Sequence, residues 1–428
     1  MLTFFPALAA DIAGFRGAIN ALRSAPIPNA KAPTGTSHAQ EKSNQRGNNM
    51  ANGCKLEYEG KEPKESILKN TPSAKLRLSE EIHGQSLSKY LEKEWMNKLI
   101  FGDNLSILKN LYGDKNICGH VSLIYIDPPF STKQEFKTRE DEQAYFDYLV
   151  GSEFVEFIRK RIVLLRELLS DDGSMYVHLD QKMGHYIKII MDEVLGQDNF
   201  RNDITRIKCN PKNFRRKAYG NIKDVIYFYS KVNMQGNHVI WNDYLPPSTD
   251  SELETRFPKI DKNGRRYATT PIHAKGETKN GVTGQLWKGM APPKGRHWRY
   301  APDELTRLDE QGLIEWSKTD NPRKIIYADE SLGKKVQDVW EYKDKGVNTS
   351  LYPTEKNEEL LDFIINNSSR KGDLVLDCFC GSGTTLHAAE KLGRRWIGID
   401  NSKTAIEATK KKLLGLESCQ PFNLYESV

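Results

Sequence analysis

The sequence predicts an α/β protein built on a doubly wound, Rossmann-like sheet that a basic segment interrupts. Three observations predict it: apolar strand patterns alternate with helical ones, a glycine-rich turn joins two strands across a helix, and the middle of the chain carries the excess of positive charge. Alternation of strands and helices is typical of sheets with helices on both faces. We therefore expect parallel strands that end at one common edge, where ligands bind in such folds.

Residues 1–75 are expected to form a disordered extension. Residues 25–52 contain no aromatic residue and are rich in Pro, Ala, Asn, Lys, Ser, Thr, Gln and Gly, so they bury too little apolar surface to offset their ordering entropy. The apolar residues 1–10 lack a basic start and are followed by Asp11, which argues against a secretory signal. An organellar transit peptide and a start at Met50 are the alternatives.

Residues 76–200 are interpreted as the first half of the sheet domain. Residues 121–126 form an apolar run typical of a buried strand. Residues 154–169 and 183–195 carry apolar side chains at helical spacing, and residues 174–178 between them have the pattern of a strand. Residues 141–148 are polar and are predicted to form a mobile loop over a substrate.

The tetrapeptide Asp127-Pro128-Pro129-Phe130 follows directly after the apolar run. A carboxylate, two rigid residues and an aromatic ring are therefore presented at the carboxyl end of a strand. Proline fixes φ and has no N–H, so this turn offers carbonyl acceptors with little conformational freedom to lose. We expect Asp127 and a proline carbonyl to accept the two hydrogens of an amine while Phe130 stacks on its ring. An ordinary Pro-Pro turn is the alternative.

Residues 374–400 have the pattern of a strand, a helix and a second strand. The first strand ends at Asp377 and leads into a glycine-rich turn, and the second ends at Asp400. Gly381 and Gly383 allow close approach of the backbone to a ligand, and the helix amino end supplies N–H groups. Asp400 can accept hydrogen bonds from ribose hydroxyls.

Three kinds of cofactor compete for this turn. A dinucleotide fingerprint requires a third glycine, but Leu386 stands three residues after Gly383. A phosphate-binding loop requires a lysine, and this turn has none. A nucleoside cofactor without a pyrophosphate remains, and S-adenosylmethionine meets that description.

These motifs resemble those of the amino DNA methyltransferases, which act on adenine N6 or cytosine N4. The resemblance rests on the tetrapeptide as the catalytic motif and on residues 377–385 as the cofactor motif, with further matches at residues 101–105, 352–356 and 394–400. The catalytic motif precedes the cofactor motif, which is the permuted order of the β group. This order is similar to that of the modification subunits of type III restriction systems.

The resemblance implies an S-adenosylmethionine-dependent methyltransferase whose catalytic half is residues 76–200 and whose cofactor-binding half is residues 336–428. Residues 201–335 would form a target-recognition insert. The catalytic residues implied are Asp127, Pro128, Pro129 and Phe130. Adenine is the preferred target, because cytosine N4 enzymes of this motif order often carry serine where Asp127 stands. The cofactor-binding residues implied are Asp103, Lys356, Asp377, Phe379, Gly381, Ser382, Gly383, Thr384, Thr385 and Asp400.

The basic charge belongs to the middle segment. Residues 201–299 contain 20 Lys and Arg against 8 Asp and Glu, with aromatic residues interleaved. This composition suits phosphate neutralisation and base stacking, although a solvated basic face over an aromatic core is the alternative. Residues 224–229 are expected to be a core strand that returns to the sheet. The DNA-binding candidates are the densest basic cluster: Lys212, Arg215, Arg216 and Lys217.

The remaining features limit partners and location. No apolar run approaches the ~20 residues of a membrane span. Six cysteines and nine histidines show no metal-ligand spacing, so we expect no metal site, reduced thiols and a cytoplasmic protein, with His178 and His185 as packing or polar residues. The expected partner is double-stranded DNA, and a separate restriction subunit or a homodimer is compatible. A cytosine N4 enzyme, a non-catalytic DNA-binding specificity subunit, and an enzyme that methylates RNA or a protein amide are the alternatives.

Overall fold

The computed structural model describes the chain from residue 54 onward, within one compact unit. The predicted extension before residue 54, together with Phe130, Lys212 and Arg216, lies outside the described residues. The described residues are 54–84, 95–129, 151–211, 215, 217–232, 238–317, 321–331, 335–344 and 356–428, with the backbone alone of 135–137 and 143–146.

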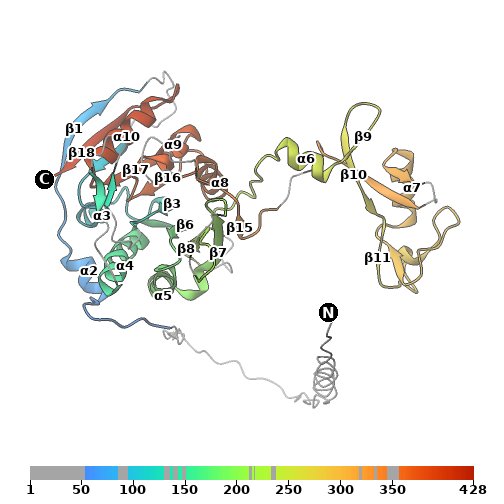
Figure 1. The fold of residues 1–428 in the computed structure, drawn as a ribbon, viewed down its shortest axis with the longest axis horizontal. Helices are drawn as coiled ribbons and strands as arrows, with labels where there is room; N and C mark the ends of the chain where they lie inside the picture. The colour runs from blue at the N-terminus through green and yellow to red at the C-terminus, as the bar shows by residue number, and fades with distance from the viewer. Residues whose placement is uncertain are drawn as a thin grey trace, which may run out of the picture. The chain divides into compact units, whose positions relative to one another are not determined.

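A ten-stranded sheet forms the centre of this unit (Figure 1). Its strands, in spatial order, are β1 (Leu76–Ile82), β18 (Phe422–Ser427), β2 (Asn97–Phe101), β17 (Arg395–Asp400), β16 (Leu374–Asp377), β3 (Val121–Ile126), β6 (Leu169–Leu179), β8 (Lys223–Ser230), β7 (Phe200–Ile207) and β15 (Val339–Trp340).

The neighbours from β18 through β6 all run parallel. β1 pairs antiparallel with β18, and β8 pairs antiparallel with both β6 and β7. β17 and β16 lie between β2 and β3, so the two halves of the chain interleave in one sheet. The predicted doubly wound α/β fold is confirmed, with antiparallel strands added at its margins.

Helices cover both faces of this sheet. One face packs against α3 (Asn104–Gly113), α4 (Gly151–Leu168) and α5 (Gly184–Leu195), and the other against α8 (Glu358–Ser368), α9 (Thr384–Lys391) and α10 (Lys403–Leu414). Every residue of β3 is buried, because successive side chains enter opposite cores. Ile124 and Ile126 join the core with α3 to α5, whereas Leu123 and Tyr125 join the core with α8 to α10.

Residues 200–230 extend this main sheet. β8 agrees with the strand expected at residues 224–229, and β7 pairs beside it. The segment that departs from the sheet is therefore shorter than the predicted insert of residues 201–335. Residues 143–146, within the predicted loop, form β5 (Gln143–Phe146), which pairs antiparallel with β4 (Glu135–Lys137).

The insert has a small core of its own. One sheet has the order β13 (Ile314–Trp316), β14 (Pro322–Tyr327), β10 (Arg266–Pro271) and β9 (Lys259–Ile260), and a second pairs β11 (His273–Lys275) with β12 (Arg296–Trp298). α6 (Asp250–Arg256) and α7 (Pro302–Glu310) accompany them, and the short 3-10 helices are η3 (Val282–Gly284) here and η1 (Gln197–Asn199) before β7. Trp287 and Trp298 are buried with Leu305 and Ile314, so these tryptophans are core residues and not an exposed stacking surface.

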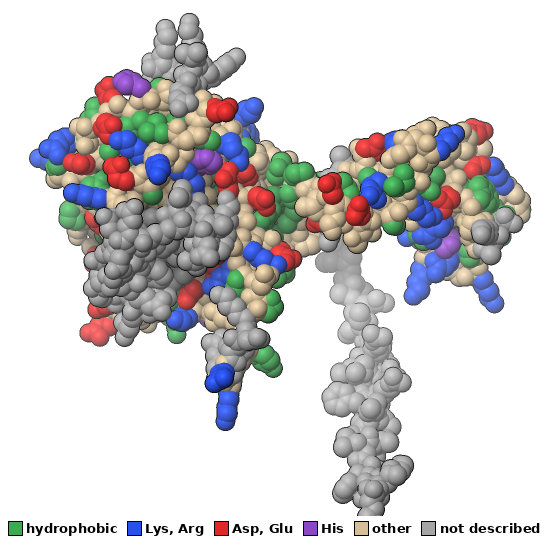
Figure 2. Space-filling view, turned by 45° about the horizontal axis from the view of Figure 1, so that its top comes forward, with side chains coloured by type: hydrophobic (Ala, Val, Ile, Leu, Met, Phe, Trp, Pro, Cys, Tyr) green, Lys and Arg blue, Asp and Glu red, His purple; other side chains and the backbone are tan. Residues whose placement is uncertain are grey.

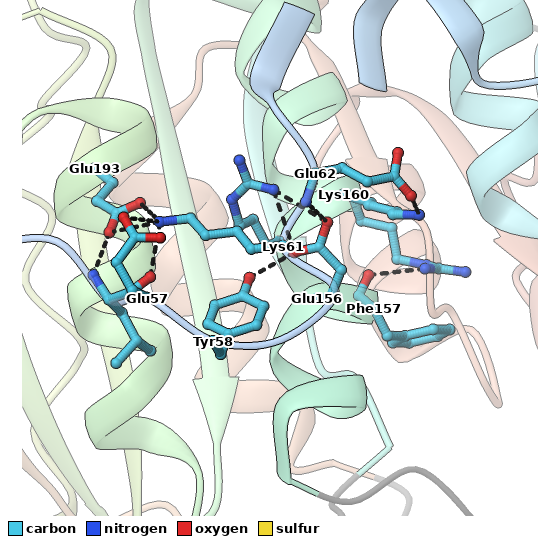
Figure 3. Close-up of polar contacts among 11 residues, drawn as sticks. Glu57, Tyr58, Lys61, Glu62, Glu156, Phe157, Lys160 and Glu193 are labelled. Atoms are coloured by element: carbon cyan, nitrogen blue, oxygen red, sulfur yellow. Dashed lines mark hydrogen bonds and ion pairs between the residues drawn. The ribbon is translucent and has the colours of Figure 1, made fainter. Parts of the chain in front are cut away.

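Residues 54–75, predicted to be disordered, instead pack on α4 and α5 (Figure 3). The Tyr58 hydroxyl donates to Glu156 of α4, and the Lys61 ammonium lies 2.9 Å from Glu193 of α5. α2 (Lys64–Asn70) follows and buries Ile67. Sequence composition missed this segment because its order depends on partners about 100 residues away in the chain.

Candidate active site

Four parallel strands that lie side by side each end in an acidic segment. Asp103 follows β2, Asp400 ends β17, Asp377 ends β16 and Asp127 follows β3. The register aligns these ends, since Asp400 lies opposite Phe101 and Asp377 opposite Gly398. The sequence-predicted acidic residues therefore meet at the carboxyl edge of the sheet, where open α/β folds bind ligands.

The glycine-rich turn closes on Asp400. The Gly381 N–H donates to one carboxylate oxygen of Asp400 at 2.8 Å, and the Ser402 N–H donates to the other at 2.9 Å. Burial raises the pKa of Asp400, and these backbone N–H groups oppose that rise. The two predicted residues Gly381 and Asp400 are thus directly bonded, and the carboxylate is fixed in one orientation.

Gly383 is required at the start of α9. Its φ of +74° is left-handed, and a Cβ there would lie 2.6 Å from Thr409 atoms of α10. The Thr409 hydroxyl donates to the Gly381 carbonyl at 2.9 Å, so the same threonine supports the turn. Ser382, Thr384 and Thr385 are buried around this helix start, and Phe379 is partly buried.

In a dinucleotide fingerprint, a glycine on the helix allows the helix to pack closely on the strand. Here the glycine that allows α9 to pack closely on β17 lies on the strand. Leu386 occupies the fingerprint's third glycine position on the helix, and it packs onto Gly398 of β17. A Cβ on Gly398 would approach Leu386 to 2.2 Å. The small residue that this close approach needs is therefore on the strand.

Asp377 is fully buried beneath the turn. Burial raises its pKa to about 7, while the Thr385 side chain and the Phe379 N–H favour its charged form and the charges of Asp127 and Asp400 oppose it. The Phe379 N–H donates to Asp377 at 3.0 Å. A cationic ligand beside this buried carboxyl would favour its charged form.

Arg161 of α4 links Asp103 to the glycine-rich turn of residues 378–383, which is predicted to bind the cofactor. Its guanidinium lies 3.3 Å from Asp103 and donates to the side-chain Oδ1 of Asn104 at 2.6 Å, and the Asn104 side-chain amide donates to the Cys378 carbonyl at 2.6 Å. Burial lowers the pKa of Arg161 to about 10, and the charge of Asp103 opposes that shift. Asp103 also caps α3 by accepting from the Ser106 N–H at 2.9 Å. The sequence singled out Asp103, and Asn104 lies within the matched residues 101–105. Sequence reasoning missed Arg161, which carries no motif of its own.

Asp127 and the two prolines leave β3 beside the cofactor turn. The Lys356 ammonium lies 2.8 Å from Oδ2 of Asp127, so this predicted cofactor residue contacts the predicted catalytic carboxylate. Oδ1 of Asp127 is buried and has no hydrogen-bond partner among the described residues. A buried acceptor without a partner is costly, and it marks a position where a ligand donor would be stabilised.

A buried histidine lies behind Asp127. His178 of β6 has Nδ1 2.8 Å from the Tyr125 hydroxyl and 3.9 Å from Oδ1 of Asp127, and its Nε2 is 3.4 Å from Asp224 of β8. Asp224 is in turn held by Lys208 at 2.7 Å and by Arg206 at 3.7 Å. The sequence predicted His178 to be a packing or polar residue. Its partner Asp224 is 46 residues away along the chain and lies on the neighbouring antiparallel strand β8.

A family described as "DNA methylase", whose profile covers N6 and N4 methyltransferases, matches residues 121–411. This match spans more than half of the 428 residues. The chain belongs to the N6/N4 amino DNA methyltransferase family. It is thereby a DNA amino methyltransferase, acting on adenine N6 or cytosine N4.

Known members show how far this likeness extends. The Type II methyltransferase M.EcaI of Enterobacter cloacae is 40% identical over 363 residues, which cover 83% of this chain and 77% of that protein. The Type III restriction-modification enzyme StyLTI Mod subunit of Salmonella typhimurium is 25% identical over 336 residues, or 69% of this chain and 50% of that subunit. The chain spans about half the length of this Mod subunit. A solved structure titled "crystal structure of M1.HpyAVI-SAM complex" aligns with 74% of this chain and 99% of its own, with 18% identity and a TM-score of 0.37.

The basic surface of this amino DNA methyltransferase is only partly described. Of the predicted DNA-binding cluster, Arg215 and Lys217 are exposed between β7 and β8. Acidic and basic side chains are interspersed on the face shown in Figure 2, and in the insert Arg265 pairs with Asp329 and Glu330. A further set of exposed basic residues, which the sequence did not single out, lies on and beside the β11–β12 hairpin: Lys275, Lys294, Arg296 and Arg299.

Metal and membrane features are not found in the part of the chain that the structure describes. The described residues contain no group of three His, Cys, Asp or Glu side chains arranged to hold a metal ion. Among the same residues, no helix combines the length and apolarity that a membrane span requires. The six cysteines are free thiols.

Proposed function

We propose that this protein transfers a methyl group from S-adenosylmethionine to the exocyclic N6 amine of adenine in duplex DNA. The observation that carries the proposal is the unpartnered, buried Oδ1 of Asp127, which follows β3 next to the strand that leads into the glycine-rich turn. An amine with two hydrogens fits two fixed acceptors. The preference for adenine rests on Asp127, where the resembling cytosine N4 enzymes often carry serine.

The residues at the sheet edge fit the cofactor. Asp400 has both oxygens oriented by backbone N–H groups, which leaves lone pairs to accept from a ribose diol. Burial raises the pKa of Asp377 and of Asp400, and a positively charged ligand beside them would favour their ionised forms. When bound, S-adenosylmethionine supplies a methyl group activated by a sulfonium centre. Asp103, Phe379, Gly381, Gly383 and Asp400 are the residues proposed to hold it, with Ser382, Thr384 and Thr385 shaping the helix start.

The protein's own residues position and polarise the amine. Asp127 and the Pro128 carbonyl accept its two hydrogens, which draws the nitrogen lone pair out of conjugation with the ring and toward the methyl carbon. Phe130 stacks on the base. Such fixed acceptors need no reorganisation during the reaction, so positioning and electrostatics account for most of the rate.

The target base must leave the duplex to reach this edge, because its amine is inaccessible inside the stack. Flipping costs a few kcal/mol, and stacking on Phe130 offsets roughly 1–3 kcal/mol of it. Exposed basic residues such as Arg215 and Lys217 are proposed to neutralise phosphates. A separate restriction subunit is a compatible partner, since one relative is a Mod subunit of a type III enzyme.

Methyl transfer by the purified full chain tests this function. The protein is incubated with S-adenosylmethionine labelled in the methyl group and with duplex DNA, single-stranded DNA, RNA or protein, and labelled products are identified by mass spectrometry. We expect label in N6-methyladenine of duplex DNA, and none with Asp127→Ala, which should still bind the cofactor. Label in N4-methylcytosine, RNA or protein would refute the target, and a protein that binds DNA without any transfer would support a non-catalytic specificity subunit instead.

A further inference from the structure

The reaction proposed above produces a proton that needs an acceptor. When the amine lone pair bonds to the methyl carbon, the carbon–sulfur bond breaks and its electron pair stays on sulfur, so the positive charge moves to the nitrogen. One N–H proton must then leave for the product to become a neutral secondary amine. The carboxylate that accepts a hydrogen bond from that N–H is Asp127.

Protonation of Asp127 would disturb an ion pair. Its Oδ2 lies 2.8 Å from the Lys356 ammonium. A neutral carboxyl would weaken this ion pair inside a site where the Asp127 side chain is only 19% exposed. A base behind Asp127 could take up this proton and so restore the ion pair between Asp127 and Lys356 before the next turnover.

His178 is that base by position. Its ring is fully buried, and its Nδ1 lies 3.9 Å from Oδ1 of Asp127, so a small movement of either side chain brings the two atoms into hydrogen-bond distance. The groups that face the imidazole are Tyr125 and Asp127 from the β3 end, Asp224 from β8, Arg206 from β7, and Lys356. This set places a carboxylate on each side of the ring.

The surroundings keep His178 neutral at rest and able to take up one proton. Burial lowers its pKa, and the Lys356 and Arg206 charges act in the same direction, while Asp224 and Asp127 oppose them. Burial alone would raise the pKa of Asp224, but hydrogen bonds from His178 and Lys208 and the charge of Lys208 hold it well below its usual range. Asp224 therefore stays ionised and can stabilise an imidazolium, as the buried aspartate does in a Ser-His-Asp triad.

We propose that His178, acting through Asp127, receives the proton that the target amine loses and holds it as an imidazolium between Asp127 and Asp224. The proton moves from nitrogen to Oδ1 of Asp127 and then to Nδ1 of His178, where it replaces the hydrogen bond that the Tyr125 hydroxyl donates to this nitrogen, and the hydroxyl oxygen then accepts from the new Nδ1–H. The proton returns to solvent when the methylated base leaves. Because His178 acts through Asp127 in this scheme, it is a positioning residue. This inference rests on the proposed function.

The pH dependence of the single-turnover rate tests this role. In the wild type, the rate should fall at acidic pH, because His178 is then already protonated and cannot accept the proton from Asp127. Asp224→Asn removes the anion that favours the imidazolium, so this acid limb should move to lower pH. Lys208→Met removes a positive charge that partly neutralises Asp224. Asp224 should then favour the imidazolium more strongly, so the limb should move to higher pH. The matched control is Lys188→Met, which breaks a lysine–aspartate pair of 2.8 Å on α5 and should leave the limb in place.

His178→Gln provides the second measurement. It should lower the single-turnover rate at least about tenfold and remove the acid limb due to His178, with the dissociation constant of S-adenosylmethionine unchanged. Lys208 is 26% exposed, so its variant keeps the test valid if the buried variants fail to fold. The inference would be wrong if the acid limbs of the wild type and Lys208→Met fell at the same pH, or if folded His178→Gln kept the wild-type rate. Either result would leave the proposed function intact. A wild type that transfers no methyl group to DNA would overturn the proposed function as well.

Discussion

Replacement of Gly383 by alanine should destabilise both the fold and the cofactor turn. The left-handed φ of +74° costs a non-glycine residue about 1–2 kcal/mol. The new Cβ would also lie 2.6 Å from the Thr409 side chain, and overpacking of this kind typically costs a further 1–3 kcal/mol. We expect a loss of roughly 2–5 kcal/mol in the free energy of unfolding.

Gly393→Ala separates the two contributions. Gly393 ends α9 with a φ of +71°, and a Cβ there would meet no atom within 4 Å. This variant should therefore show only the backbone cost of about 1–2 kcal/mol. The difference between the two variants isolates the contact with Thr409.

Urea unfolding of both variants measures these costs, and calorimetry measures the affinity for S-adenosylmethionine. Displacement of Thr409 would break its 2.9 Å hydrogen bond to the Gly381 carbonyl, so Gly383→Ala should weaken cofactor binding about tenfold or more, which corresponds to about 1.4 kcal/mol. Gly393→Ala should bind the cofactor as the wild type does. Equal destabilisation by the two variants, or unchanged affinity in Gly383→Ala, would refute the reasoning.

Three further changes test other parts of the structure. Replacing Arg215 and Lys217 together by alanine should lower the steepness of log affinity for DNA against log salt concentration by about 2. The control Lys69→Ala on α2 should leave this slope unchanged. An unaltered slope in the double variant would count against Arg215 and Lys217 as part of the DNA-binding surface. Burial raises the pKa of Asp377 to about 7, so its contribution to stability is present below its ordinary pKa of 3.8 and is lost as pH rises through about 7. Asp377→Asn should therefore gain stability relative to the wild type between pH 5 and pH 8 in urea unfolding, and a constant difference would contradict this direction. Tyr58→Phe removes the hydrogen bond to Glu156 and should cost about 1–3 kcal/mol, while Tyr186→Phe at an exposed site of α5 should cost almost nothing.

The turns that follow β3 and β16 could be predicted because each is a local pattern in consecutive residues. The apolar run at residues 121–126 coincides with β3, and the helical spacing after residue 183 agrees with α5. Gly381 and Asp400 were paired by the strand–helix–strand pattern, and the structure joins them by a hydrogen bond.

Features that depend on distant partners could not be predicted in this way. Asp224 is a polar residue near the start of a largely apolar strand, and only the antiparallel pairing of β8 with β6 brings it to His178. The link from Arg161 through Asn104 to Cys378 joins three separate elements, and residues 54–75 gain their order from α4 and α5. The insert's aromatic residues illustrate the same limit, because composition does not distinguish a stacking surface from the buried core that Trp287 and Trp298 form.

The identity of the methylated base tests the central claim most directly. DNA from a host that expresses the full chain is digested to nucleosides and compared by mass spectrometry with DNA from a host that expresses Asp127→Ala at the same level. The account predicts N6-methyldeoxyadenosine with the wild type and its absence with the variant. N4-methyldeoxycytidine in place of the adenine product, or equal methylation by the Asp127→Ala protein, would contradict it.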